Sequence, residues 1–403
     1  MTIEPEECRE PTIFNSLPVF IFVGIFLFIA LLYRQTDLAL LAFLILLVVS
    51  TAKTWSSMSL YRVRCTISID KQRVFPGETL VLETNLENAK LLPVRLRVQW
   101  SLGSALKQVG GDEHVFRQET GLLWYQRAQL QWDLVARRRG VIQMGPDCIR
   151  AGDLLGFFEK KRRSQETICI IVYPQIVRLK SISLPMRDLF GVPGAKSPVK
   201  DPVYILGTRD YQPSGPSRHI HWKASARHRR LQEKVFEPSE QEKVMLALEV
   251  GSFGKSTAKE AFEHTLEVIA SLAVQLQEMG CAVGLATNGV MTGGGFSVLP
   301  ATRAPRQLPA ILETLARLQT AQKGAIEPIM RQALGSQRGV SCAYFSYQAG
   351  RTAAESETYC RQQNIPITFF VCRSDPEFEA IRQKSRAGMH TLDEIRIQGN
   401  EPV

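Results

Sequence analysis

Two long apolar stretches near the N-terminus constrain this chain more than any other feature. Residues 11–33 contain no charged side chain, and residues 38–52, which follow a short link, contain none either. A helix needs about 20 apolar residues to cross a bilayer. The first stretch meets that length. The second meets it when Lys53 extends its amine to the headgroups and Trp55 lies at the interface.

We therefore predict a transmembrane hairpin over residues 1–55, with membrane helices at 13–33 and 38–54. A pair of buried core helices is the alternative, but unbroken hydrophobicity of this length favours the membrane. A secretory signal peptide is disfavoured, because the leader before the first stretch is acidic and no small-residue cleavage site follows it.

The distribution of basic residues predicts which side of the membrane the folded part occupies. The hairpin link contains a single arginine, whereas the second stretch is followed by Lys53, Arg62, Arg64, Lys71 and Arg73. The positive-inside rule places such a basic flank in the cytoplasm. We expect an inner (cytoplasmic) membrane protein with both termini and its soluble domains in the cytoplasm.

The formal net charge of +10 comes from the middle of the chain. Lys and Arg exceed Asp and Glu by 12 over residues 61–240, whereas the two classes balance after residue 240. A basic segment beside a membrane anchor suits anionic lipid headgroups or an acidic partner. Nucleic acid is not expected as a partner, because no groove-reading motif accompanies the charge. The eight cysteines form no CxxC pair, which indicates reduced core thiols.

Residues 61–173 alternate apolar and polar side chains with a period of two. One such run places Val94, Leu96, Val98 and Trp100 on one face. Runs of this kind separated by Pro and Gly turns are typical of half-buried antiparallel strands. We predict an all-β sandwich domain of immunoglobulin-like type. Its basic runs at 137–139 and 160–163 are either solvated loop charge or lipid contacts.

Residues 174–242 are rich in proline at first, and we predict a connecting arm. Its second half contains the dense segment 207–237, GTRDYQPSGPSRHIHWKASARHRRLQEKVFE. The Pro-Ser-Gly-Pro at 213–216 favours a tight reversal, and the arginines offer planar donor forks suited to carboxylates or carbonyls.

This segment resembles the signature of a bacterial family, domain of unknown function 58, whose pattern runs R-x-Y-x-x-G-D-x-x-R-x-I-x-W-x-x-S-A-R, then L, then F-E. The residues that fall on it are Arg209, Tyr211, Arg218, Ile220, Trp222, Ser225, Ala226, Arg227, Leu231, Phe236 and Glu237. The Gly-Asp of the pattern is Gly215–Pro216 here, so its aspartate is absent. Residues 138–158, with Asp153 and Gly156–Phe157, also resemble the β-domain of the family.

The resemblance implies an architecture and a partner. It implies two membrane helices, a β-rich domain and a von Willebrand factor A-like domain. It also implies a MoxR-type AAA+ ATPase as partner, in envelope or protein-complex assembly.

From residue 243 onward, near-continuous apolar strands alternate with helices. We predict strands at 244–250, 281–287, 340–347 and 365–372, and helices at 258–279, 306–318 and 353–364. This alternation predicts a parallel sheet covered on both faces. By resemblance we assign 243–373 to an α/β, von Willebrand factor A-like (Rossmann-like) domain, and 374–403 to a C-terminal tail. Ligand sites in such sheets lie at the carboxyl ends of strands, which points to the loop 249–257.

That loop has two functional interpretations and one structural one. A P-loop would use Gly254 and Lys255, but its first glycine position holds Glu249, a carboxylate that repels phosphate. A metal-ion-dependent adhesion site, D-x-S-x-S, would hold Mg²⁺ through oxygen atoms. Its positions are Glu249, Gly251 and Phe253, so both hydroxyls are missing.

A remnant of that metal site would comprise Glu249, Gly251, Ser252 and Thr287. We favour the structural interpretation, a strand-to-helix turn with Ser256 or Thr257 as the helix N-cap. No metal or other cofactor is therefore expected, and Mg²⁺ is the ion that the loop would take if it bound one.

The remaining polar clusters do not indicate an enzyme. His219, His221 and His228 have no carboxylate or cysteine among them, so we favour satisfied or exposed histidines over a zinc site. No nucleophile–base pair or paired carboxylates stand out, and no small-molecule substrate is evident. The cluster formed by Arg209, Tyr211, Arg218, Trp222, Ser225 and Arg227 has two compatible interpretations. It is a protein-binding hot spot, or it pins the turn to the sandwich and to the α/β domain.

We favour a membrane-anchored, cytoplasm-facing, non-enzymatic interaction or scaffold protein that works with a MoxR-type AAA+ ATPase. The alternative is a nucleotide-binding enzyme that uses the Gly-rich loop 251–257. A third hypothesis, nucleic-acid binding by the basic middle, predicts an affinity that falls steeply with salt.

Overall fold

The structure, a computed structural model, describes residues 16–395 apart from short gaps, which are 104, 112–114, 147, 153–158, 164–165, 181–199, 212–216, 218–219, 239–242, 255–257, 336, 338, 349 and 374–387. The predictions for Arg218, for Lys255 and for the 153–157 motif lie outside the described residues. The chain divides into two compact units, residues 1–173 and residues 174–403, and each is described by itself.

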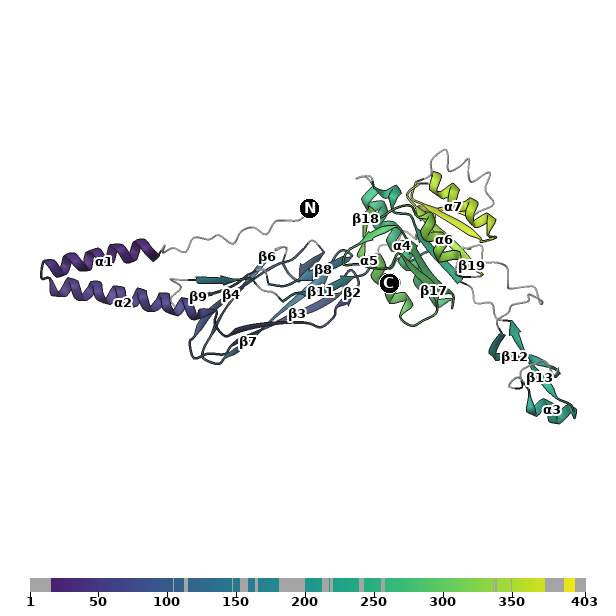
Figure 1. The fold of residues 1–403 in the computed structure, drawn as a ribbon, viewed down its shortest axis with the longest axis horizontal. Coiled ribbons are helices and arrows are strands. Elements are labelled where there is room, and N and C mark those ends of the chain that lie inside the picture. Colours follow the sequence, from purple (N-terminus) through teal and green to yellow (C-terminus); the bar gives the residue numbers. More distant parts are fainter. Residues whose placement is uncertain are drawn as a thin grey trace. The chain divides into compact units, whose positions relative to one another are not determined.

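Two apolar helices open the first unit, α1 (Ser16–Leu32) and α2 (Thr36–Ser59), and they lie side by side (Figure 1). In the part of the chain that the structure describes, α2 is the one helix long and apolar enough to cross a membrane, and α1 is a shorter apolar helix. Most of their large apolar side chains are exposed. The helix predicted to end at residue 54 continues to Ser59, because its last turn is bonded to the β-rich domain.

The strands of the β-rich domain are β1 (Val63–Ile69), β2 (Arg73–Val74), β3 (Thr79–Asn88), β4 (Val94–Ser101), β5 (Leu106–Gln108), β6 (Val115–Leu122), β7 (Arg127–Ala136), β8 (Gly140–Met144), β9 (Cys148–Gly152), β10 (Glu159–Arg162) and β11 (Ile168–Val172). They form two four-stranded sheets, β1-β3-β7-β5 and β10-β9-β4-β6, and a three-stranded sheet, β2-β11-β8. β2 runs parallel to β11, and the other pairs are antiparallel.

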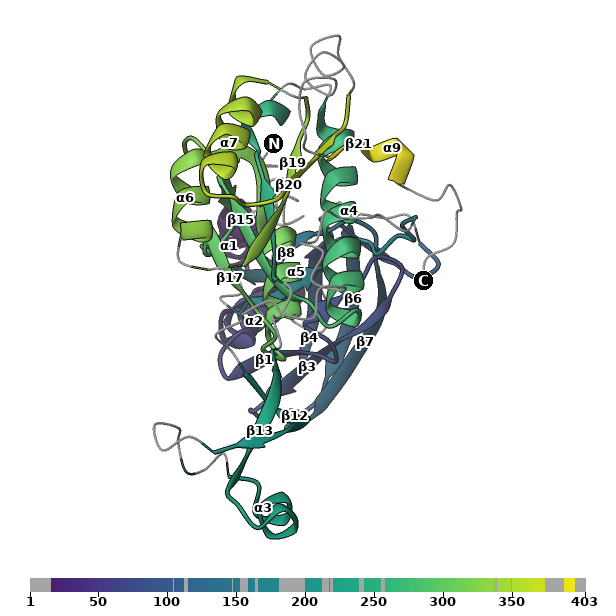
Figure 2. The same cartoon turned by 90° about the vertical axis from the view of Figure 1, so that its right-hand side faces the viewer.

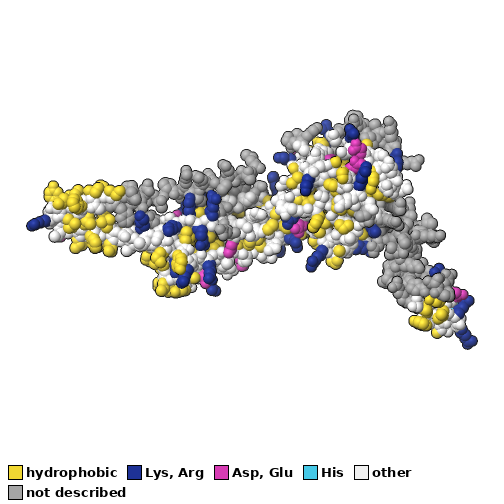
Figure 3. Space-filling view, in the orientation of Figure 1, with side chains coloured by type: hydrophobic (Ala, Val, Ile, Leu, Met, Phe, Trp, Pro, Cys, Tyr) yellow, Lys and Arg dark blue, Asp and Glu magenta, His cyan; other side chains and the backbone are white. Residues whose placement is uncertain are grey.

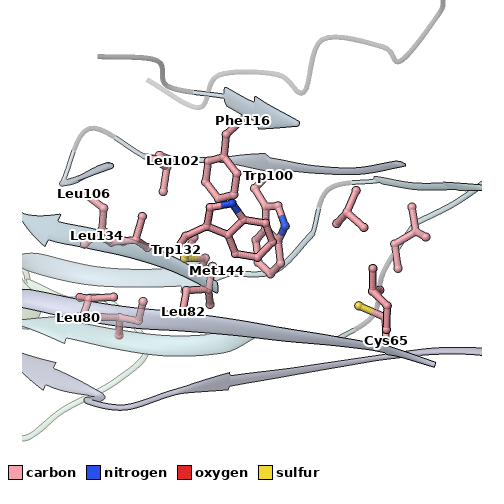
Figure 4. Packing of buried hydrophobic residues seen from close by; sticks show 14 of the residues in the cluster. Cys65, Leu80, Leu82, Trp100, Leu102, Leu106, Phe116, Trp132, Leu134 and Met144 are labelled. Carbon is pink, nitrogen blue, oxygen red and sulfur yellow. The ribbon is translucent and has the colours of Figure 1, made fainter. Parts of the chain in front are cut away.

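Both four-stranded sheets contribute alternate side chains to one core (Figure 4). The rings of Trp100 on β4 and Phe116 on β6 are stacked with centroids 6.1 Å apart, and Trp132 on β7 lies 5.1 Å from Phe116. The period-two pattern arises because successive strand side chains point to opposite faces, so one face fills the core and the other meets water.

A buried lysine joins α2 to this domain. The last carbonyls of a helix have no partner within the helix, and the Lys90 ammonium, in the loop between β3 and β4, supplies one. Its Nζ donates to the carbonyl oxygens of Met58 (3.0 Å), Ser59 and Tyr61 (2.9 Å). Only 8% of Lys90 is exposed, and burial lowers its pKa to about 8. We call this arrangement the lysine clasp.

The second unit begins with β12 (Lys200–Asp210), α3 (Trp222–His228) and β13 (Gln232–Pro238). β12 and β13 pair as an antiparallel hairpin, so the predicted connecting arm contains regular structure. The proline-rich start of that arm also has fixed contacts, because the Val177 amide donates to Ser271 Oγ (2.8 Å) and the Lys180 amide donates to the Ile395 carbonyl (2.8 Å).

The rest of the unit is an α/β domain. It comprises β14 (Lys243–Leu248), η2 (Gly251–Phe253), α4 (Lys259–Glu278), β15 (Ala282–Thr287), β16 (Gly289–Met291), β17 (Val298–Thr302), α5 (Gln307–Arg317), β18 (Leu318–Gln322), α6 (Glu327–Gly335), β19 (Val340–Ser346), α7 (Arg351–Gln362), β20 (Ile367–Val371), β21 (Gly388–Thr391) and α9 (Leu392–Ile395). Helices α4 and α5 cover one face of its main sheet, and α6 and α7 cover the other (Figure 2).

The main sheet has the order β17-β15-β14-β19-β20-β21. Five strands are parallel, as the apolar runs predict, but the edge strand β17 is antiparallel to β15, so the sheet is mixed. The other edge is β21, which pairs with β20 and comes from the segment predicted to be a tail. The α/β domain therefore does not end at residue 373, and its last strand was missed because it is only four residues long.

The described cysteines are free thiols, and most of them are buried, in agreement with reduced core thiols. Cys169 is the exception, because it lies on β11 with an exposed side chain. Burial raises the pKa of Cys65 to about 11, and of Cys372 to about 11.

The lysine clasp predicts that Lys90→Met loosens the domain from the helix. The substitution leaves the carbonyls of Ser59 and Tyr61 without their donor and that of Met58 with backbone amide donors alone, which costs about 1–3 kcal/mol. Because the pKa of Lys90 is lowered to about 8, the folded amine loses its proton before the unfolded one does. Wild-type stability relative to Lys90→Met therefore rises between pH 8 and about 10.5. Urea unfolding of the full chain in detergent measures the free energy of unfolding of both proteins at each pH. Hydrogen exchange of the amides in β1 and β3 serves as the second measurement.

The same substitution at the exposed Lys71 is the control, and it should change stability by less than about 0.5 kcal/mol at every pH. A stability difference between wild type and Lys90→Met that stays constant or narrows above pH 8 would contradict the clasp as described.

Candidate functional site

The signature segment folds as a short helix seated on a hairpin. β12 and β13 bring residues 209–210 opposite residues 232–233, and α3 lies between the two strands in sequence. The His221 amide donates to the Gln232 carbonyl (2.8 Å), and His221 Nδ1 accepts the Ala224 amide (3.1 Å), so His221 is the N-cap of α3. This capping role agrees with a satisfied histidine rather than a metal ligand.

The buried Ser225 side chain links α3 to β13. Its buried hydroxyl accepts the Gln232 amide (2.8 Å) and donates to the His221 carbonyl (3.1 Å). The neighbouring Glu233 is also buried, and its carboxylate accepts a charge-assisted bond from Arg209 Nε. Ser225, Gln232 and Glu233 therefore form a polar frame that holds the segment in one shape.

The frame presents an exposed surface of aromatic, aliphatic and basic side chains. Trp222 is 70% exposed on the first turn of α3, and Leu231 is exposed at the start of β13. The exposed lysine and arginines of α3 and the turn after it are Lys223, Arg227, Arg229 and Arg230, of which Arg230 is paired with Asp210 at 3.0 Å. We call Trp222, Leu231 and these four basic residues the α3 surface.

The structure thus divides the predicted signature residues into two groups. Ser225 and the Arg209–Glu233 pair hold the frame, whereas Trp222 and Arg227 are exposed. Tyr211 donates its amide to the Leu231 carbonyl (2.8 Å) and so continues the hairpin. The prediction that the cluster pins the turn to the other domains stays a prediction.

The second predicted site lies at the carboxyl end of β14, where the sheet order reverses between β15 on one side and β19 on the other. The backbone of Glu249 bonds to Phe345, and Ser252 Oγ accepts the Tyr347 amide (3.0 Å). Open α/β sheets in general bind ligands at such a reversal of strand order. The structure thus brings Glu249 and Ser252 together with the end of β19.

The polar groups of this loop bind one another. The buried Glu249 carboxylate accepts the Ser252 amide (3.1 Å), and the amides of Phe253 and Gly254 bond to carbonyls within η2. A phosphate would need free amides there. Phe253, at the third position of the metal-site pattern, is buried against Phe262 and Tyr347. These contacts favour the structural interpretation of the loop.

Thr287 also has a structural role, since its buried hydroxyl accepts the Gly289 amide (3.2 Å). Among the residues that the structure describes, no three His, Cys, Asp or Glu side chains are grouped so that they could hold a metal ion. The predicted N-cap at Ser256 or Thr257 lies outside the described residues, and α4 is described from Lys259, after Ala258.

Sequence reasoning missed Asn288, which organises this end of the sheet. Its Oδ1 accepts the Val250 amide and its Nδ2 donates to the Gly324 carbonyl, both at 2.8 Å. The side chain thereby holds the loops after β14, β15 and β18 in register. The sequence offered one indication, an Asn-Gly pair directly after a predicted strand.

Burial raises the pKa of Tyr344, on β19, and the nearby Glu249 carboxylate adds to the rise. Both groups are buried, and the Glu249 carboxylate accepts the Ser252 amide. The candidate site whose aromatic and basic side chains are exposed is therefore the α3 surface.

Removing the Ser225 hydroxyl should loosen the frame. Ser225→Ala leaves the buried Gln232 amide without its acceptor, at a cost of about 1–3 kcal/mol. Amide exchange in residues 222–234 of the full-length protein should accelerate by about 5- to 150-fold, since about 1.4 kcal/mol corresponds to a factor of ten. Ser217→Ala, at an exposed serine of the same segment, is the control. Equal exchange in both variants would remove Ser225 from the frame.

Comparison with known proteins agrees with the sequence resemblance. Residues 207–340 match the model of the family described as "Protein of unknown function DUF58". The "Uncharacterized protein YeaD" of Bacillus subtilis (strain 168) is 26% identical over 269 residues, which are 66% of this chain and 64% of YeaD. The match thus spans less than two thirds of the length of that relative.

Solved structures give little to compare. A β-glucosidase from Listeria innocua in complex with gluconolactone aligns with a TM-score of 0.17 and 10% identity, over 28% of this chain and 16% of that one. The β-glucosidase EmGH1 from Erythrobacter marinus gives 0.18 and 10%, over 27% and 15%. Scores this low do not bear on fold or function. Because its signature residues and the family model coincide on the same segment, this chain carries a DUF58 region over residues 207–340.

Proposed function

We propose that this protein is a membrane-anchored, non-enzymatic interaction protein that presents the α3 surface to a protein partner. The observation that carries the proposal is the contrast between a buried polar frame and the exposed side chains that it holds. Trp222 is 70% exposed, while Ser225 and Glu233 beneath it are buried and bonded. Holding a tryptophan in water has no stabilising value for the monomer, whereas Trp and Arg dominate binding energy at protein interfaces.

The charge of the α3 surface favours an acidic partner. Among the acidic residues of the same hairpin, Asp210 pairs with Arg230 and the buried Glu233 pairs with Arg209. Complementary charge increases association rates and restricts partner choice. The partner that the family resemblance implies is a MoxR-type AAA+ ATPase, in envelope or protein-complex assembly.

The apolar hairpin supplies the anchor in this proposal. α2 is long and apolar enough to span a bilayer, and α1, which packs beside it, would cross as the second helix of the hairpin. The basic residues after α2 favour a cytoplasmic position for both folded units. The β-rich domain would then be a sandwich of immunoglobulin-like type, and the α/β domain a von Willebrand factor A-like module without its metal ligands.

The α3 surface predicts loss of partner binding in Trp222→Ala. A hot-spot tryptophan contributes about 2 kcal/mol or more, so binding should weaken by at least about 30-fold. The measurement is recovery of an AAA+ ATPase, identified by mass spectrometry, from the native membrane fraction with a non-hydrolysable ATP analogue. Phe296→Ala removes an aromatic side chain that is 74% exposed in the α/β domain, and it should leave recovery unchanged. Equal recovery with Trp222→Ala, or none with wild type, would refute the proposal.

The cytoplasmic position can be tested through Cys169, the exposed thiol described on β11. A membrane-impermeant maleimide should label Cys169 in permeabilised cells and leave it unlabelled in intact cells. Cys169→Ser identifies the labelled peptide. Labelling of Cys169 in intact cells would place the β-rich domain outside and would exclude a cytosolic ATPase as its partner.

A further inference from the structure

The end of the β-rich domain next to α2 carries a concentration of exposed apolar side chains. The registers place the C-terminal ends of β3 and β6 and the N-terminal ends of β4 and β7 at this end, because Val94 pairs with Leu122 and Glu87 pairs with Arg127. The connecting loops are 89–93 and 123–126. The exposed side chains here are Met58, Tyr61, Leu91, Leu123, Trp124 and Tyr125, and we call them the apolar end surface. Figure 3 shows hydrophobic surface over α1 and α2 and again at this end of the domain.

Internal hydrogen bonds fix this surface. The buried Asn88 donates from Nδ2 to the Leu92 carbonyl (2.9 Å) and to the Leu123 carbonyl (2.8 Å), so one amide ties both loops together. The Tyr125 amide donates to the Lys90 carbonyl (3.2 Å). Tyr125 has φ +53°, a left-handed conformation in which glycine or asparagine is usual. The loops therefore hold their apolar tips outward.

The same loops are bonded to the last turn of α2. The lysine clasp links Lys90 to the helix end, Trp55 Nε1 donates to the Pro93 carbonyl (2.9 Å), and Ser59 Oγ donates to the Ala151 carbonyl (3.0 Å). The helix and this end of the domain are thus one rigid piece rather than two parts joined by a linker.

The length of α2 sets the depth of this rigid piece. The 20 residues from Thr36 to Trp55 span about 30 Å, the thickness of the hydrocarbon core. Ser59 lies four residues, or about 6 Å, beyond Trp55. The headgroup layer on each side is about 5–7 Å deep, so the bonded loops lie at headgroup level.

Side-chain chemistry at this end matches that layer. Trp and Tyr are enriched at membrane interfaces because their rings combine an apolar body with a polar tip. No Asp or Glu occurs in residues 53–69, 89–93 or 121–126. Lys160 on β10 donates from Nζ to the Ser57 carbonyl (3.0 Å), which puts a cation at the same level. Cations at this level suit anionic headgroups, and the acidic Glu87 and Glu159 at the same strand ends are paired with Arg127 (2.9 Å) and Arg97 (3.8 Å).

From this geometry we infer that the β-rich domain is itself seated in the bilayer surface, with the loops 89–93 and 123–126 inserted among the lipid headgroups and Trp124 at the top of the acyl chains. The inference rests on the proposed crossing of the membrane by α2. The β-rich domain is then a peripheral membrane-binding module in addition to being attached to α2. The apolar end surface binds the lipid bilayer.

Tryptophan quenching by brominated lipid tests the inference on the full-length protein. The protein is placed in nanodiscs of phosphatidylcholine and phosphatidylglycerol at one chain per disc, with bromine on the phosphatidylcholine acyl chains either near the headgroup or near the chain end. The difference in emission between wild type and Trp124→Phe isolates Trp124. It should be strongly quenched by the shallow bromines and less by the deep ones. The matched control is Trp222→Phe, since Trp222 is also largely exposed, and its emission should be quenched by neither lipid.

A second variant tests whether the two loops insert together. Leu91→Asp keeps Trp124 but adds a charge to the partner loop, and it should reduce the quenching of Trp124 and increase its accessibility to aqueous acrylamide. Quenching and accessibility equal to wild type would refute joint insertion.

The remaining outcomes separate this inference from the anchor. If the protein stays with the discs but Trp124 is as open to acrylamide as Trp222, the inference is wrong and the anchor stands. If Trp124 becomes shielded only when several chains share a disc, a second copy covers the surface, which also overturns the inference. If the protein does not stay with the discs, both the anchor and the inference fail.

Discussion

The end of a helix leaves several carbonyls without partners, and the way this chain satisfies them determines the arrangement of its first unit. At the end of α2, Lys160 donates to the Ser57 carbonyl, and the Lys90 ammonium donates to the carbonyls of Met58, Ser59 and Tyr61. Because the cation comes from a loop of the β-rich domain, capping the helix and docking the domain are one interaction. A helix that ended in water would be capped by solvent, and the domain would then be free to pivot. The buried cation thus fixes the orientation of the β-rich domain relative to α2.

Both candidate sites contain buried polar groups that are bonded internally, but the two sites differ in what they leave exposed. At the carboxyl end of β14, Glu249 accepts the Ser252 amide, and Asn288 accepts the Val250 amide and donates to the Gly324 carbonyl. At α3, the Ser225 hydroxyl and the Glu233 carboxylate are satisfied inside, and Trp222 remains exposed. Polar groups that are bonded in this way stabilise the loop, and they are not available to bind a ligand. The α3 surface has the opposite character, which is why we assign the interaction to it.

Much of the fold follows from sequence periodicity, and the remainder depends on contacts that periodicity does not encode. The alternating strands of residues 61–173 and the parallel core strands are determined by which faces are buried, and the two N-terminal helices by their unbroken apolar composition, so these patterns are visible in the sequence. β17 and β21 are short edge strands with one neighbour each, and their patterns are too brief to distinguish from loops. The hairpin of β12 and β13 was missed because its prolines favoured an arm.

The candidate sites were predictable to a similar degree. The motif identified the α3 segment, but it did not separate framing residues from exposed ones, because that depends on the register of β13 against β12. The role of Lys90 had no sequence indication at all, since a lysine between two strands is ordinarily solvated. Likewise, Leu91 and Trp124 lie 33 positions apart in the chain. Only the strand pairing brings their loops to one end of the domain.

The pairing of β21 with β20 affects how the protein folds during its synthesis. The central strands of the sheet and their helices leave the ribosome first, but the edge of β20, with its apolar Phe369 and Phe370, has no neighbour until residues 388–391 emerge. The exit tunnel delays that moment further. In the proposal that α1 and α2 cross the membrane, both helices have by then met the insertion machinery, so this domain would complete its sheet while already held at the membrane.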